Sequence, residues 1–473
     1  MKVPNPHDGV ALSTVSPVAP LPMSNNEETA TSSVHPTSKT DDAFLVAFND
    51  PHDEDNPKDW PDARKWAVTD ILSATGFNRI MVSTIMAPAL PLIAQELNIG
   101  TPESAMALSI YLLATAFGPL VIGPLSEIYG RKRVLHVSNV WFRVWNIACG
   151  FASTKEVLIA SWFLAGFGAS AIYALGGGVL GDFWRPEQRG RSLGYYLLIP
   201  LLGAAVGPII GGFMAGRTTW RWMFWSTSIF QTAMIAVSLE VFRETYAPLI
   251  LRRHLTTASA SLFHPIIQIN ALIAGLEYGL LYIVLSSFSE VWTSHYSQPV
   301  ELSGLHFIVT ALGEVAGSQL MSRAMDVHFQ RSRASDGSSA PESRLPLMLP
   351  GVLLGQLGLL MYGWTAQYRM HWAVVDVGIF VSLLGMQSAG MPLSAYVIDM
   401  YEEHASSALA ATQFLRSLTA FLFPLFAPAL YRGLGYGWGH SALATPGLLI
   451  GLPAPMIPWV YGAKLRAKAA SSY

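Results

Sequence analysis

The sequence predicts an all-α membrane protein whose chain crosses a bilayer twelve times, in two halves of six helices each. Hydrophobic residues make up 51% of the 473 residues and charged residues 13%, a balance typical of a chain that lies in lipid. A hydrocarbon core about 30 Å thick requires roughly 20 helical residues to cross it. Runs of that length, bounded by charged or turn residues, occur at 66–90, 104–125, 134–153, 157–180, 192–213, 221–241, 266–289, 303–324, 345–366, 372–398, 406–430 and 439–460.

Glycine and proline residues mark two of these runs as candidates for a broken helix. The fourth run contains three consecutive glycines at 176–178, and the tenth contains Gly390, Met391 and Pro392. Glycine and proline are frequent causes of sharp kinks. We therefore expect breaks at these two places.

The basic residues predict how the runs are oriented. Loops after even-numbered runs carry clusters such as Arg131, Lys132 and Arg133, whereas loops after odd-numbered runs carry few basic residues. Cytoplasmic loops of membrane proteins are enriched in lysine and arginine, so we expect both termini in the cytoplasm. The loop that begins at Asp399 is the exception, because it is acidic.

The runs divide the chain into five parts. Residues 1–60 are rich in serine, threonine and proline and lack the pattern of a signal peptide, so we expect a disordered cytoplasmic tail. Residues 61–243 form the first half, 244–263 a short cytoplasmic linker, 264–462 the second half, and 463–473 a second cytoplasmic tail. We expect a monomer embedded in a lipid bilayer.

Several function classes have no support in the sequence. A net charge of −2 gives no sign of nucleic-acid binding. The one cysteine, Cys149, can form no disulfide within the chain. Metal-ligand spacings, a nucleophile elbow and a phosphate-binding loop are all missing from the sequence. We therefore expect no enzyme, no ATP-driven pump, no metal and no cofactor.

A charged turn separates the second and third runs. Gly123 and Glu127 precede it, Gly130 allows the chain to reverse, and Arg131 and Lys132 begin the next run. Glu127 can pair with the basic residues across the turn, so the cluster can fasten two helices and release them. We predict a cytoplasmic gate loop here. The segment resembles the loop that joins helices 2 and 3 in transporters of the major facilitator superfamily.

Other segments extend this resemblance over nearly all of residues 56–466. Residues 56–60, 186–190, 244–248 and 414–417 are similar to segments of fungal drug:proton antiporters with twelve spans. The resemblance implies the major facilitator fold, a small-molecule substrate and protons as partners. It also implies the plasma membrane, with the vacuolar membrane as the alternative.

The two halves indicate a duplication, as is common in secondary transporters. After the eighth run, Arg323, Asp326 and Arg331 follow one another somewhat as Glu127 and its basic neighbours do after the second. We interpret the three residues as a degenerate copy of the charged turn.

The fifth run carries small residues at regular spacing. Glycines four residues apart allow a neighbouring helix to approach closely, and a proline bends its own helix. The pattern resembles the motif that marks exporters of the superfamily, and ordinary small-residue packing is the alternative. Its residues are Gly194, Gly203, Gly207, Pro208, Gly211 and Gly212.

Arg79 lies deep in the first run, where a charge is costly unless it faces a cavity or a partner. Thr75, Arg79 and Ser83 follow at steps of four and share one helix face. We predict that this face lines a transport cavity, with Arg79 contacting an anionic group of the substrate or pairing with a carboxylate. A purely structural ion pair is the alternative.

Two acids in the second half are candidates for proton coupling. Glu277 in the seventh run and Glu314 in the eighth both fall near the middle of the membrane. Tyr278 and Tyr282 lie beside Glu277 on the seventh run, and His306 begins a polar stripe that leads to Glu314. We predict that these residues line the transport cavity, and a buried structural hydrogen bond is the alternative for each acid.

Two positions depart from the family pattern. Trp162 stands where the antiporters usually have an arginine assigned to proton transfer, which weakens the case for proton coupling. Ser286 replaces an acid frequent in fungal relatives, which argues against a polycationic substrate. We predict an exporter of drug-like or secondary-metabolite compounds, driven by proton antiport through alternating access. The alternatives are a polyamine or cation exporter, a proton-coupled importer and a non-transporting receptor.

Overall fold

Helices account for every element in the residues described by the computed structural model, which are 53, 55–251, 265–336, 341–401 and 404–462. Most of the predicted N-terminal tail and linker, and the whole predicted C-terminal tail, lie outside these residues. In chain order the elements are η2 (Pro57–Asp59), α1 (Asp62–Ile85), η3 (Ala87–Ala89), α2 (Leu90–Glu96), α3 (Thr101–Tyr129), α4 (Arg131–Gly150), α5 (Lys155–Ala169), α6 (Ala171–Phe183), η4 (Pro186–Gln188), α7 (Arg189–Arg217), α8 (Arg221–Val241), α9 (Ala247–Ile250), α10 (Pro265–Glu290), η6 (Val291–His295), α11 (Val300–Leu305), α12 (Phe307–Asp336), η7 (Pro341–Leu347), α13 (Met348–Gln367), α14 (Trp372–Met400) and α15 (Ala405–Gly451).

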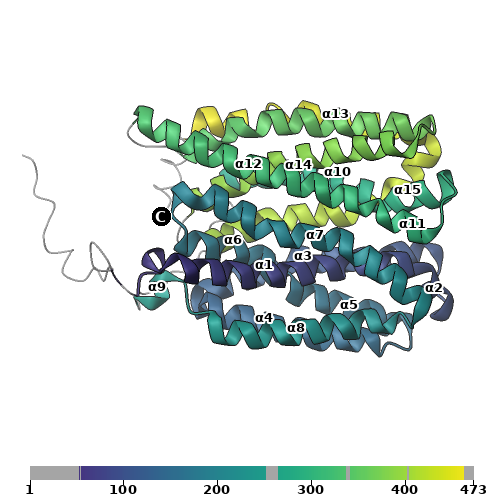
Figure 1. The fold of residues 1–473 in the computed structure, drawn as a ribbon, viewed down its shortest axis with the longest axis horizontal. Coiled ribbons are helices and arrows are strands. Elements are labelled where there is room, and N and C mark those ends of the chain that lie inside the picture. The colour runs from purple at the N-terminus through teal and green to yellow at the C-terminus, as the bar shows by residue number, and fades with distance from the viewer. Residues whose placement is uncertain (1–52, 54, 252–264, 337–340, 402–403, 463–473) are drawn as a thin grey trace, which may run out of the picture. The chain divides into compact units, whose positions relative to one another are not determined.

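The long helices run side by side along one direction, and they form two groups (Figure 1). Helices α1 to α8 form one group, and α10 to α15 form the other. We call the end of the bundle at which α1 begins the charged end, because Glu127, Arg131, Asp182, Arg344 and Asp399 lie there, and we call the other end the opposite end. The predicted all-α class is confirmed.

Seven helical stretches within the described residues are long and apolar enough to cross a membrane. They cover eight of the predicted spans, because the stretch Ala405–Gly462 contains the last two. Helices α1, α4, α8 and α12 coincide with the other four predicted spans but carry more polar residues, such as Asn78 and Arg79 in α1. That all twelve cross the membrane stays a prediction.

The fourth and tenth spans do not break at the residues predicted from the sequence. The fourth span breaks at Ser170, between α5 and α6, and α6 continues through the glycines at 176–178. Helix α14 continues through Pro392. The range of α15 contains two helices that meet at Gly435, where φ is 71° and ψ is 177°, between the eleventh and twelfth predicted spans. The glycine-rich stretch of α6 serves close packing instead, because a Cβ on Gly178 would contact the Ser406 side chain of α15.

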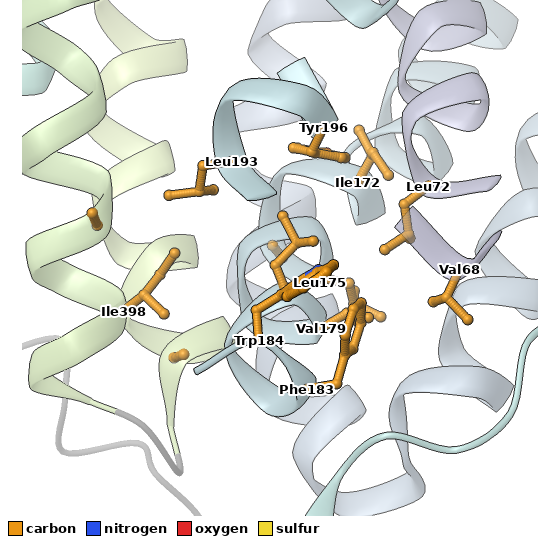
Figure 2. Packing of buried hydrophobic residues seen from close by; sticks show 14 of the residues in the cluster. Val68, Leu72, Ile172, Leu175, Val179, Phe183, Trp184, Leu193, Tyr196 and Ile398 are labelled. Atoms are coloured by element: carbon orange, nitrogen blue, oxygen red, sulfur yellow. The ribbon is translucent and has the colours of Figure 1, made fainter. Parts of the chain in front are cut away.

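A cluster of buried apolar side chains joins the two groups near the charged end (Figure 2). Leu175 and Val179 of α6 and Leu193 of α7 come from the first group, and Ile398 of α14 comes from the second. Figure 2 shows Ile398 facing the α6 and α7 side chains from the neighbouring helix. The cluster excludes water from the space between the two groups at this end.

Candidate functional site

The main cavity lies between the two groups of helices. It is lined by α1, α6 and α7 on one side and by α10, α12, α14 and α15 on the other. Its empty volume is about 1300 Å³, including space continuous with solvent. Leu193 and Ile398 of the apolar cluster also line the cavity, so the cluster closes it toward the charged end. Its polar lining residues include Tyr173, Tyr196, Tyr278, Tyr282, Glu314, Gln387, Gln413 and Arg416.

A smaller chamber adjoins this cavity and shares much of its lining, including Tyr278, Glu314 and Arg416. The chamber has an empty volume of about 720 Å³ and is lined by Glu277, Tyr278, Glu314 and Arg416, among others. Glu314 is 8% exposed, and no hydrogen bond or ion pair holds its carboxylate within the described part of the chain. The structure therefore brings together the two acids that the sequence singled out on neighbouring spans.

Tyr278 and Tyr282 form an aromatic wall of the cavity. Their ring centroids are 5.1 Å apart. The Arg416 guanidinium carbon lies 4.2 Å from the centroid of the Tyr278 ring, within the range of a cation–π interaction. Arg416 thus places a positive charge among two acids and two phenols, an arrangement suited to a molecule with both apolar and polar groups.

Arg79 does not line the cavity, which corrects the expectation from its depth in the span. Its Nη2 donates a hydrogen bond to Asn139 Oδ1 of α4 at 2.5 Å, and its guanidinium carbon lies 3.6 Å from the Phe142 ring centroid. The residues of α1 that line the cavity are Gly76, Ile80 and Thr84. The predicted face was therefore one residue off, about 100° around the helix.

Trp162 lies near Arg79 inside the first group. It is fully buried, and its ring centroid is 4.6 Å from that of Tyr111. The Tyr111 hydroxyl donates to the backbone oxygen of Arg79 at 3.3 Å. The position at which the antiporters usually carry an arginine is therefore filled here by a packed indole ring.

His306 also lies outside the cavity lining, at the opposite end of the bundle. Its Nδ1 is 2.8 Å from Asp376 Oδ2, its Nε2 is 2.9 Å from Gln298 Oε1, and its ring stacks on Trp292 with centroids 3.6 Å apart. These contacts fasten the junction of α11 and α12 to α14. A structural hydrogen-bond network accounts for the residue.

The charged turn has the conformation that its sequence suggests. Gly130 has a φ of 92°, a region that favours glycine, and it separates α3 from α4. Arg131 is fully buried, with its Nε 3.2 Å from Asp182 Oδ2 and its Nη1 2.7 Å from Ser126 Oγ. The backbone N–H groups of Arg131 and Lys132 donate to Glu244 at 2.8 and 3.2 Å. The side chain of Glu244 thus caps the start of α4, where negative charge is favourable.

Glu127 connects the turn to the other group of helices. Its carboxylate accepts hydrogen bonds from the backbone N–H of Ser407 at 2.9 Å and from the Ser407 hydroxyl at 2.6 Å. Gly123, one turn earlier, permits this approach of α3, because a Cβ there would lie 3.0 Å from Ser406 O of α15. The turn therefore holds α3 against the start of α15.

A second set of contacts joins the two groups nearby. Asp326 of α12 accepts a hydrogen bond from the backbone N–H of Arg191 at 2.9 Å. Asp399 of α14 forms ion pairs with Arg189 of α7 and with Arg344, whose Nε lies 2.7 Å from Asp399 Oδ2. Asp182, Arg189 and Arg344 were not among the sequence candidates; the acidic exception at Asp399 was the available signal.

The glycines of the fifth span face two different helices. A Cβ on Gly203 would lie 2.7 Å from Phe77 O, and Cβ atoms on Gly207 and Gly211 would also meet the backbone of α1. A Cβ on Gly194 would instead meet Ser322 of α12. Pro208 lies inside α7, which continues through it, and Gly212 has only a distant neighbour in Pro88. Close packing of α7 on α1 accounts for the regular spacing.

The sequence matches one family model and is similar to fungal proteins described as efflux pumps. A family model described as "Major Facilitator Superfamily" matches residues 72–424. A protein described as "Probable efflux pump mfs2" from Aspergillus flavus is 52% identical over 424 residues, which cover 82% of this chain and 100% of that protein. "Efflux pump vrtL" from Penicillium aethiopicum is 37% identical, with 90% of this chain and 91% of that protein covered.

Solved structures share the fold. The proton:xylose symporter XylE bound to 6-bromo-6-deoxy-D-glucose superposes with a TM-score of 0.66 at 14% identity, covering 85% of this chain and 96% of that chain. The human organic anion transporter MFSD10 gives a TM-score of 0.62 at 14% identity, covering 82% and 98%.

Proposed function

Since this chain belongs to the Major Facilitator Superfamily, we propose that it is a secondary active transporter that exports drug-like or secondary-metabolite molecules in exchange for protons. Relatives described as efflux pumps support the direction of transport. The observation that carries the proposal is the cavity between the two halves, which is closed at the charged end and lined by Glu314 and Arg416, with Glu277 in the adjoining chamber.

Glu314 is the carboxylate best suited to carry the proton. It lines both the main cavity and the chamber, and no partner in the described residues fixes its charge. Burial in a membrane protein makes a charged carboxylate costly, so uptake of a proton and entry of a substrate can compete there. Glu277 lines only the chamber, whose lining also includes Arg416 and Glu314, so it acts as the second acid of the pair.

Transport requires the charged end to open and close. We place that end in the cytoplasm, as the basic loops suggest, so this conformation is closed to the cytoplasm. Opening to the cytoplasm then breaks the contacts of Glu127 with Ser407, of Asp326 with Arg191 and of Asp399 with Arg189. Polar contacts at helix ends of this kind can re-form in each cycle.

The lining favours a mostly apolar substrate with a few oxygen or nitrogen atoms. Four tyrosines supply apolar faces with polar tips, and Gln387 and Gln413 can donate and accept hydrogen bonds. A cation exporter is the second candidate, because two acids lie together in the chamber. Arg416 beside Tyr278 opposes a polycation there.

The proposal is tested by measuring accumulation of a panel of fluorescent drugs and natural products in pump-deficient yeast that expresses the chain at the plasma membrane. Lower accumulation, abolished by a protonophore, supports proton-driven export. Increased accumulation would indicate an importer and would overturn the proposal. Export that persists with the protonophore present would contradict the proton coupling alone.

A further inference from the structure

The groove between α4 and α8 contains an arginine deep within the predicted membrane region. Arg143 lies about 18 Å from the start of α4 and about 10 Å from its end, well inside a hydrocarbon core about 30 Å thick. A charged side chain at this depth is costly unless it faces a polar cavity or a partner. The groove is separate from the transport cavity, because the two share no lining residue.

The groove has an empty volume of about 580 Å³, including space continuous with the surroundings. One end is aromatic, with the Phe151 and Trp225 ring centroids 5.2 Å apart. Ile229 of α8 lines it and is 65% exposed, so the groove opens outward from the bundle toward the lipid. Arg143 is the only ionisable residue in its lining.

Neither of the two helices that form the groove places an acid beside Arg143. Its Nε is buried and has no hydrogen-bond partner in the described residues. The hydroxyls of Ser228 and Thr232, which also line the groove, donate to the backbone oxygens of Phe224 and Ser228 at 2.7 and 2.8 Å. Helix α4 contains no acid, and the one acid of α8, Glu240, lies about 12 Å beyond Thr232 along the helix.

We propose that this groove binds a compact lipophilic carboxylic acid, with its carboxylate on Arg143 and its apolar body against Phe151, Trp225 and Ile229. A guanidinium offers paired donors that match the two oxygens of a carboxylate. The aromatic end suits an aryl body. The site is independent of the proposed transport function.

The depth of Arg143 decides which anion can reach it. The phosphate of a phospholipid stays in the headgroup layer, and the Cα–Cβ bond of Arg143 tilts toward the start of α4, away from the nearer surface. A weak acid crosses the hydrocarbon layer in its neutral form. Beside the guanidinium its ionised form is stabilised, so the acid is held where a phospholipid headgroup cannot lie.

The proposal is tested by photolabelling the purified full chain in zwitterionic nanodiscs with an aryl-diazirine benzoic acid and, in parallel, with its methyl ester. Labelled peptides are mapped by mass spectrometry. We expect the acid to label peptides that contain Phe151 or Trp225 several-fold more than the ester does, with unlabelled aryl acid competing. Arg143→Gln should reduce this labelling about tenfold, the loss of one charge-assisted contact, and Arg143→Lys should retain part of it.

Two further variants keep the test decisive. Arg133→Gln changes an exposed arginine of the same helix and should leave labelling unchanged. Thr232→Trp fills the groove without changing its charge and should exclude the acid even if Arg143→Gln fails to fold. Equal labelling by the ester, labelling unaffected by Arg143→Gln, or displacement of the acid by phosphatidylserine in the nanodisc would each overturn the proposal.

Discussion

Glu127 and Asp326 hold equivalent positions in the two halves of the protein. Each accepts a hydrogen bond, at 2.9 Å, from the backbone N–H of the third residue of a helix in the other half, Ser407 of α15 and Arg191 of α7. A carboxylate at a helix start satisfies an N–H that has no partner within the helix and interacts favourably with the helix dipole. The interpretation of Asp326 as part of a degenerate copy of the first charged turn agrees with this geometry.

Removing either carboxylate should open the charged end. A side-chain cap contributes about 0.5–2 kcal/mol, so Glu127→Ala and Asp326→Ala should each raise the population of the form open at this end by roughly two- to thirtyfold. The two effects should add, because the contacts lie on different helix pairs. The measurement is electron–electron distance spectroscopy between spin labels at Tyr129 of α3 and Val327 of α12, both exposed, in a Cys149→Ala background.

Glu156→Ala is the matched control, because Glu156 is an exposed acid in the first turn of α5. It should leave the distance distribution unchanged. If Glu127→Ala shortens the distances, or leaves them as in the wild type, the capping contact does not hold the two halves together.

Gly130→Ala should destabilise the turn between α3 and α4. With a φ of 92° and a ψ of 154°, Gly130 lies in a region that costs a non-glycine residue about 1–3 kcal/mol, and a Cβ there would also lie 2.6 Å from Leu249 Cδ2. Thermal unfolding in detergent should show a lower midpoint than in the wild type. Gly216→Ala, where a Cβ meets nothing within 4 Å, should leave the unfolding midpoint unchanged. An equal fall of the midpoint in both variants would show that the conformation of Gly130 is not the cause.

Asp399→Asn should strongly lower the free energy of unfolding. Asp399 pairs with Arg189 and Arg344, whose side chains are 0% and 1% exposed, so the change leaves two buried cations without their shared counter-ion. Breaking a buried ion pair in this way costs about 3–5 kcal/mol. Arg344→Met combined with Asp399→Asn should recover part of the loss in a thermal-unfolding cycle. A double variant that is simply additive would show that Asp399 and Arg344 are not coupled.

The contacts of Glu96 with Arg221 and Trp220, at the opposite end of the bundle, predict that the stability of the fold depends on pH. Hydrogen bonds from Arg221 and Trp220, both at 2.6 Å, lower the pKa of Glu96 below its ordinary value of 4.5. A lowered pKa in the folded protein means that the pair stabilises the fold above pH 4.5 and loses this contribution as the pH falls through the lowered pKa. Glu96 is half exposed, so the effect is small.

This dependence is measured by comparing unfolding midpoints of the wild type and Glu96→Gln from pH 7 down to pH 3. The difference between them should be largest at pH 7 and should shrink in acid. A difference that grows as the pH falls would have the wrong sign for a carboxylate held in its charged form.

Spacing in the sequence correctly grouped residues on one helix face. It did not always predict which neighbour that face contacts. Glu277 and Glu314 were found from their depth in two spans, and both reach the central chamber. Arg79 was found in the same way, yet it faces Asn139 inside its own half. Spacing within one helix fixes relative directions around the axis, but the absolute direction depends on how the helix packs against its neighbours.

Local sequence patterns could not predict ion pairs between residues that lie far apart in the chain. Asp399 disagreed with the charge rule that assigned the loops, and its partners lie 55 residues away at Arg344 and farther still at Arg189. Periodicity and spacing carry no information about such pairs. The family resemblance and the all-α fold were predicted correctly, because composition and several short motifs along the chain carry both.

Coupling at Glu314 is tested most directly in proteoliposomes that contain the purified chain and a substrate identified in the yeast assay. Transport driven by an imposed pH gradient is compared with exchange of labelled for unlabelled substrate at equal pH, for the wild type, Glu314→Gln and Glu156→Gln. If Glu314 carries the proton, Glu314→Gln abolishes gradient-driven transport and retains exchange, while Glu156→Gln behaves as the wild type. Gradient-driven transport by Glu314→Gln at the wild-type rate would contradict the account.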